Sequence, residues 1–483
     1  MSPGALGLTA LIVYLAVLVA VAERARRARV DLTPADHFLA GRHLGVFVLF
    51  LTLYATAYSG NSLLGYPAEA YRRGYSWIMA TGFMMSIVVV FHALVPRLRP
   101  LSVRHGFVTP GDYIRLRFRG QPRVDTLRRV VAVLMTIALG NFLLAQLVAM
   151  GLVAHEFTAG LLPYWAGVVG LAGMILLYET LGGMRAVAWT DAAQGILMLC
   201  GLGALLVWLL GEAGGLAAAT RGVATVRPEA VAVPAGRELA NWASTIVLLG
   251  LASVVYPQAI QRIYAARSGS VLKRSLALMT FMPLVTTLVV TLIGLAAIPR
   301  FAGLGALEAD VVMPRLLAEW TAQGLGSAAL ATLVFLGALA AIMSTADSVL
   351  LSLGSLVAED LFDRPREATE TTRFGKRAAA AAMLLAVLLA LVPELRRTLW
   401  RLIELKMELL IQCVPCFLLA LHWPRLRAAH LLAGLAVGTA FAVGLALAGQ
   451  ARLGGVHVGV LGLALNTAVC CLLAWRSDPA PAG

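Results

Sequence analysis

The stretch Thr56-Ala57-Tyr58-Ser59-Gly60-Asn61-Ser62 interrupts an otherwise apolar segment at about 44–71 with small and polar residues. Tyr256-Pro257-Gln258 does the same within the apolar segment at about 241–262. In hydrocarbon, backbone groups freed by a broken helix cost several kcal/mol unless protein, water or an ion satisfies them. The two interruptions therefore indicate a cavity, although a kinked helix that packs through small residues accounts equally well for either one alone.

The composition around these interruptions is that of a membrane protein. The 483 residues are 60% hydrophobic and 13% charged, whereas soluble domains are about 25% charged. The long runs are apolar on all sides, which favours membrane helices over the alternating strands of a β-barrel. We predict one all-α polytopic transporter domain over 1–483, with spans at about 5–22, 44–71, 76–96, 129–154, 163–182, 190–211, 241–262, 275–299, 324–361, 378–395, 399–421, 430–449 and 457–475.

The two interrupted spans are five crossings apart, an odd number, so they run in opposite directions. Broken helices at corresponding places in two inverted halves mark the substrate and ion sites of secondary transporters. We therefore predict an inverted five-helix repeat, with 44–211 as the first half and 241–421 as the second. The segments 1–22 and 430–475 are then additional spans.

Charge is distributed unevenly among the loops. The net charge is +14, and most of the 39 lysine and arginine residues fall in every second loop, beginning with 23–43. The positive-inside rule then predicts a multi-pass protein of the cell (inner or plasma) membrane with its N-terminus outside and its C-terminus cytoplasmic. Short basic loops between apolar runs do not suggest a nucleic-acid partner.

Cysteine and histidine spacing offers no enzyme chemistry. The five cysteines lie inside apolar runs, which implies no disulfide framework, and the eight histidines show no HxxH or HExxH pair. No nucleophile and base can be assembled from the motifs. We expect no catalytic residues and no organic cofactor.

Several longer stretches carry a family resemblance. They are Ala35 to Arg42 (ADHFLAGR), Ser59 to Gly74 (SGNSLLGYPAEAYRRG), Tyr178 to Gln194 (YETLGGMRAVAWTDAAQ), Pro257 to Ala266 (PQAIQRIYAA) and Ala340 to Phe362 (AAIMSTADSVLLSLGSLVAEDLF). With them the chain resembles the sodium:solute symporter family, the relatives of the bacterial proline permease and the sodium/glucose transporters. The resemblance implies a LeuT-type fold, sodium-coupled import of a solute by alternating access, and Na⁺ as the coupling ion.

The resemblance also implies a sodium site. In the family, the positions matching Ser344 and Thr345 contribute hydroxyls to Na⁺, and those matching Ala55, Tyr58 and Ala341 contribute backbone carbonyls. An all-oxygen set suits a hard cation. From the residues alone, Ser and Thr bonding back to their own helix is the competing interpretation.

Two positions depart from the proline permease pattern. Ala57 stands where that pattern has an aspartate, and Leu249 stands where it has a tryptophan. The resemblance therefore does not extend to proline as the solute, and one Na⁺ per solute is the simpler expectation. Asp347 either adds negative charge near the ion or caps a neighbouring helix end.

Candidate solute contacts combine amides with aromatic rings, which suits a small polar organic molecule. For each of them, ordinary hydrogen bonding between helices is an equal alternative. The candidates are Asn61, Ser62, Asn141, Phe142, Gln146, Tyr256, Gln258, Glu408 and Gln412.

Glu408 is included because charges inside membrane spans are costly. At 100° per residue Glu404, Glu408 and Gln412 share a helix face, whereas Lys406 points about 160° away from Glu408. On this basis we expect Glu408 to contact a charged or zwitterionic solute. The alternative is an ion pair between Lys406 and a glutamate that only fixes the register of neighbouring helices. Asp191, beside a predicted cytoplasmic turn, is assigned a structural role.

Sodium-coupled symport is the leading hypothesis for the function. A proton-coupled porter of the same fold, with Glu408 or Asp347 carrying the proton, is one alternative. A transporter-like sensor is another. The oligomeric state is left open.

Overall fold

The computed structural model describes residues 3–27, 34–363, 369–395 and 397–476. Over those ranges the chain is helical, apart from connecting turns and a small antiparallel hairpin of β1 (Arg452–Leu453) and β2 (Val456–His457). Helices satisfy their own backbone hydrogen bonds, as apolar segments in lipid require. The predicted all-α class is confirmed.

The α-helices, in chain order, are α1 Pro3–Arg27, α2 Pro34–Leu39, α3 Val46–Ala57, α4 Tyr66–Arg73, α5 Met79–Arg104, α6 Pro110–Arg117, α7 Val124–Phe157, α8 Tyr164–Ala213, α9 Leu216–Val226, α10 Arg237–Val254, α11 Pro257–Ala265, α12 Gly269–Met279, α13 Leu288–Ala296, α14 Val312–Thr321, α15 Leu325–Ser355, α16 Thr369–Ala390, α17 Leu399–Leu410, α18 Ala420–His422, α19 Ala428–Leu447 and α20 Val458–Trp475. The 3₁₀ turns are η1 Ala40–Arg42, η3 Gly74–Ile78, η4 Pro228–Val231, η6 Glu308–Val311, η8 Pro393–Leu395 and η9 Ile411–Cys413. The π-helical turns are η2 Asn61–Gly65, η5 Pro283–Thr287, η7 Leu356–Leu361 and η10 Pro415–Leu419.

Within the described ranges, eight helical stretches are long and apolar enough to cross a membrane, and the bent pair α10–α11 adds a ninth. The shorter apolar segments Val46–Ala57 and Tyr164–Leu177 fall within two further predicted spans. The second is the beginning of α8, which continues as one helix through the predicted spans 163–182 and 190–211. Other predicted spans do not form one long apolar helix because they are broken or carry charges. The predicted span 399–421, for example, begins with the 12-residue α17. The count of thirteen and the boundaries of the two halves therefore stay predictions.

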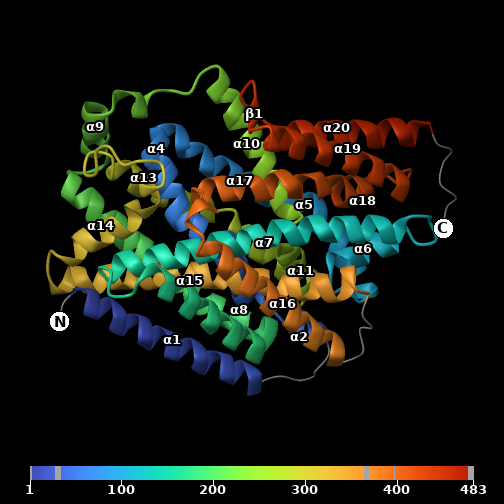
Figure 1. Cartoon of the computed structure of the whole chain (residues 1–483), viewed down its shortest axis with the longest axis horizontal. Helices are drawn as coiled ribbons and strands as arrows, with labels where there is room; N and C mark the ends of the chain where they lie inside the picture. The colour runs from blue at the N-terminus through green and yellow to red at the C-terminus, as the bar shows by residue number, and fades with distance from the viewer. Residues whose placement is uncertain (1–2, 28–33, 364–368, 396, 477–483) are drawn as a thin grey trace.

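The long helices run side by side along the longest axis of the molecule (Figure 1). Helices α7 and α15 lie in the middle of the bundle, with α1 and α8 on one side and α17, α19 and α20 on the other. Helices α1 and α20 form opposite edges and run in the same direction. The centre of the bundle is therefore built from segments far apart in the sequence.

The contact between α8 and α15 is unusually close because glycines face the neighbouring backbone. A Cβ added at Gly201 would lie 2.9 Å from the Cα of Val334, and one added at Gly337 would lie 3.0 Å from the Cα of Met198. Small residues let membrane helices approach in this way. As a result α15 is buried along most of its length, including Ser344.

Both interruptions predicted from the sequence are real breaks in helices. Helix α3 ends at Ala57, Tyr58 leaves the helical conformation with φ −102° and ψ 82°, and the chain resumes helical turns at η2. Helix α10 ends at Val254, and α11 begins at Pro257 at an angle of 50° to it. Proline lacks an amide hydrogen and disfavours helical geometry in the preceding residue, which explains the second break.

Candidate functional site

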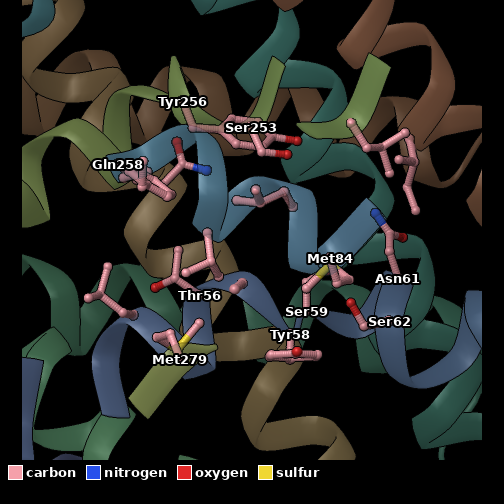
Figure 2. Close-up of a pocket in the computed structure, with 18 of the residues that line it drawn as sticks. Thr56, Tyr58, Ser59, Asn61, Ser62, Met84, Ser253, Tyr256, Gln258 and Met279 are labelled. Carbon is pink, nitrogen blue, oxygen red and sulfur yellow. The ribbon is translucent and has the colours of Figure 1, made fainter. Parts of the chain in front are cut away.

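A cavity lies between the two breaks and contains about 910 Å³ of empty space, its open mouth included. Figure 2 shows residues of the first break, from Thr56 to Ser62, on one side of the cavity and residues Ser253 to Gln258 of the second break on the other. Most of the remaining wall is apolar, including Met84 and Met279. The predicted cavity is present, and both breaks line it.

The polar atoms of this wall include groups that have no hydrogen-bond partner among the described residues. Both amide atoms of Asn61 and the Oε1 atom of Gln258 are buried without a hydrogen bond in the described part of the chain. Buried polar groups normally have partners. Amides left open on a cavity wall are therefore available to a bound molecule.

An aromatic pair forms another part of the wall. The rings of Phe142, from α7, and Tyr256 stack with their centroids 5.7 Å apart and an interplanar angle of 24°. The Nζ atom of Lys406 lies 2.9 Å from the Phe142 ring centroid and 5.5 Å from that of Tyr256. All three residues line the cavity.

Beside the first break, oxygens from α3 and α15 converge. The hydroxyl of Thr345 lies 3.4 Å from the carbonyl oxygen of Ala55 and 3.0 Å from that of Ala341. Ser344 is adjacent on α15, and Tyr58 follows on the break itself. All five residues predicted for the sodium site are buried. The structure thus brings three of them into direct contact. Ser344 is the chain neighbour of Thr345, and Tyr58 follows Ala55 by three residues.

A buried ion pair lies next to this oxygen cluster. Asp191 accepts hydrogen bonds from the hydroxyls of Ser344 and Thr52, and the Nη2 atom of Arg262 lies 3.1 Å from its Oδ2 atom. Arg262 also donates to the Ser348 hydroxyl at 2.6 Å. The pair connects α8, α3, α11 and α15 within the protein. The predicted cytoplasmic turn beside Asp191 is wrong, because Asp191 lies within helix α8 with none of its surface exposed. Its structural role stays a prediction.

A family model matches the chain from residue 37 to residue 438, across both breaks, the oxygen cluster and the ion pair, and its description is "Sodium:solute symporter family". The chain belongs to the sodium:solute symporter family. The sequence-based recognition is therefore confirmed. Members of this family are transporters rather than enzymes.

Two relatives of this symporter cover most of its length. The sodium/pantothenate symporter of Escherichia coli (strain K12) is 27% identical over 443 residues, which are 89% of this chain and 88% of that protein. The sodium/proline symporter of the same organism is 28% identical over 421 residues, covering 83% and 80% of the two chains. Sodium-coupled uptake of a small organic solute is the activity that these matches support.

A solved structure supports the same fold. A Na⁺-coupled sialic acid symporter in a substrate-bound, outward-open state superposes with a TM-score of 0.79 over 98% of each chain, at 18% sequence identity. At that identity the match is evidence for the fold alone. It confirms the predicted LeuT-type architecture.

In this symporter the charges of α17 are arranged differently from the prediction. Glu408 lies 3.9 Å from Arg401 and 3.6 Å from the Nδ1 atom of His457, and it packs against α20 at Gly459. Gln412 donates to the carbonyl oxygen of Gly459 at 2.8 Å. Neither residue lines the cavity. The face of α17 that they share is turned toward α20, and the opposite face carries Lys406 to the cavity wall.

The remaining predicted contacts divide into two groups. The cavity is lined by Asn61, Ser62, Phe142, Tyr256 and Gln258. Gln146 lies behind the wall, where its Oε1 atom accepts a hydrogen bond of 3.1 Å from the amide of Gly60 and so stabilises the break.

Sequence reasoning missed Lys406 and Arg262 as cavity residues and Asp191 as the buried partner of Arg262. The available signal was charge at the edge of, or inside, an apolar run, which marks a functional site by default in membrane proteins.

Proposed function

We propose that this symporter holds Na⁺ at the oxygen cluster of α3 and α15 and its organic solute in the adjacent cavity. The ion ligands are the carbonyls of Ala55, Tyr58 and Ala341 and the hydroxyls of Ser344 and Thr345. Supporting this assignment, Thr345 lies within hydrogen-bonding distance of two of these carbonyls, one on each helix. Na⁺ can replace the hydroxyl proton as the partner of both.

The solute contacts in this proposal are the neutral polar groups of the two breaks together with the aromatic pair. Asn61, Ser62 and Gln258 supply donors and acceptors, and Phe142 and Tyr256 supply a flat apolar surface. Such a mixture suits a small organic molecule, with specificity coming from the few polar groups. A charged or zwitterionic solute is favoured because a charged side chain, Lys406, faces the same space.

In this proposal a single break serves both ion and solute, and the neighbouring positions of the two sites support the coupling between them. Ala55 contacts Thr345 through its carbonyl, and the next residues along the chain, from Thr56 to Ser62, line the cavity. An ion that draws α3 against α15 therefore also positions the wall that meets the solute. Binding of either one then favours the conformation that binds the other, which is the requirement for coupled transport.

The proposal retains the predicted organisation of the chain. The halves 44–211 and 241–421 are related by inversion, the N-terminus is outside and the C-terminus is cytoplasmic. The parallel course of α1 and α20 supports an odd number of crossings (Figure 1). In this proposal one Na⁺ accompanies each solute, because Ala57 stands where the proline permease pattern has an aspartate.

Direct binding of radioactive sodium to the purified symporter tests the ion site without knowledge of the solute. Thr345→Ala removes one of about five oxygen ligands, and we expect at least tenfold weaker binding, about 1.4 kcal/mol. Thr345→Ser keeps the hydroxyl and should keep the affinity. Normal sodium affinity in Thr345→Ala would contradict the assignment.

Thr332→Ala is the matched control. Thr332 is on the same helix, is also buried, and donates to the carbonyl of Ala328 at 2.7 Å, as Thr345 does to Ala341. No carbonyl of α3 is recorded as its partner. The control therefore removes the bond to the helix itself and should leave sodium binding unchanged.

A further inference from the structure

We propose that the transported solute is a small organic anion, and that Lys406 provides the positive charge that its carboxylate meets. This inference rests on the proposed function, in which the cavity between the breaks is the solute site. It goes further by naming the charge of the solute and the residue that selects it.

The first support is the position of Lys406. Its side chain is 2% exposed and comes from the middle of α17, and the residue lines the cavity. Its recorded contacts with charged or aromatic groups are the two ring faces of Phe142 and Tyr256. Ring faces attract a cation, but they neutralise none of its charge.

The second support is the missing countercharge. Within the part of the chain that the structure describes, no carboxylate lies within 4.0 Å of the Lys406 ammonium. The nearby acids of the same helix have other partners, since Glu404 pairs with Arg401 and Arg452, and Glu408 faces His457. A buried charge persists when it is paired or lines a space open to water or ligand. Lys406 fits the second condition.

The third support is the charge balance of the whole cavity wall. Among the described residues of the lining, the charged side chains are Lys406 and Arg262, and there is no aspartate or glutamate. Arg262 is already compensated by Asp191 at 3.1 Å. Lys406 is therefore the basic side chain of the described lining that has no carboxylate partner.

These observations distinguish among classes of solute. A cation would meet an uncompensated like charge, and a neutral solute would leave Lys406 uncompensated. A zwitterion would bring its own ammonium into a cavity with no lining carboxylate. A monoanion supplies the missing charge through a charge-assisted hydrogen bond, and its remaining polar groups can reach the open amides of Asn61 and Gln258.

Matched pairs of ligands test this proposal on the full-length purified symporter in sodium chloride. The probes are lactate with lactamide, nicotinate with nicotinamide, and pantothenate with panthenol, together with proline as a zwitterion and choline as a cation. A ligand that binds the folded protein raises its melting temperature. We expect stabilisation by at least one acid and none by its uncharged partner. The proposal is overturned if an uncharged partner, proline or choline stabilises the protein while no acid does. It is also overturned if no compound stabilises the protein.

Variants then identify the residue responsible. Lys406→Met should weaken binding of the stabilising acid at least tenfold, and Lys406→Arg should recover part of the affinity because it restores the charge. Lys273→Met, at an exposed lysine of α12, is the control and should have no effect. Unchanged acid affinity in Lys406→Met would refute the role of this residue. Should that variant fail to fold, Lys406→Gln replaces it in the same comparison.

Sodium binding measured on the same preparations separates the two proposals. If radioactive sodium binds and depends on Thr345 while no acid is preferred, only the inference about the anion fails. If sodium does not bind to the wild type, the proposed function fails with it.

Discussion

Removing Arg262 should destabilise this symporter more than removing any exposed arginine, because it leaves the buried carboxylate of Asp191 without its countercharge. Asp191 and Arg262 are both completely buried, and their closest atoms are 3.1 Å apart. Breaking a buried pair from one side typically costs about 3–5 kcal/mol, since the remaining buried charge is left uncompensated. Arg262 also bonds Ser348 and the carbonyl of Gln258. We therefore expect Arg262→Met to lie at the upper end of that range.

The measurement is unfolding of the purified protein, followed by tryptophan fluorescence, for a complete double-mutant cycle. Arg262→Met and Asp191→Asn are made singly and together. In the double variant neither charge remains, so it should be more stable than Arg262→Met. Arg267→Met is the control, since Arg267 is an exposed neighbour of the same segment. The reasoning is refuted if Arg262→Met unfolds like the control, or if removing Asp191 as well recovers none of the loss.

Two further variants test the packing of α15 against α8 and the orientation of α17. Gly337→Leu places a side chain where an added Cβ would already lie 3.0 Å from the Cα of Met198. It should therefore lower the unfolding free energy by about 1–3 kcal/mol. Gly326→Leu is the control, on the same helix with open space beside it, and its effect should be smaller than the error of the denaturation curve. Glu408→Gln should leave solute affinity within about twofold, measured in the ligand assay above, because Glu408 faces Arg401 rather than the cavity. A loss of tenfold or more would restore Glu408 to the solute site.

Local chemistry in the sequence was sufficient to predict the two breaks. Polar residues around Gly60 and the proline at position 257 conflict with a continuous membrane helix, and this conflict does not depend on the neighbours of the helix. The structure has breaks at both places, and the cavity lies between them. The sequence therefore predicted both where these two helices break and that a cavity lies between the breaks.

Which side chains line the cavity depends on how each helix packs against its neighbours, and the prediction of these side chains was weaker. Helical periodicity correctly separated Glu408 from Lys406, but it could not say which of the two faces would meet α20 and which the cavity. Likewise Asp191 and Arg262 are 71 residues apart, and nothing in either segment identifies the other as its partner. Such assignments require the tertiary arrangement.

The joint between α10 and α11 has a consequence for how the molecule can move. An intact helix resists bending because a hinge within it must first give up hydrogen bonds of the i→i−4 ladder. At Pro257 one donor of that ladder is absent by chemistry, and the 50° bend already separates the two segments. A swing of α11 about Tyr256 therefore starts with part of its mechanical resistance removed. Because Arg262 is on the swinging segment, such a swing also pulls on Asp191, and the tether limits how far the joint can open.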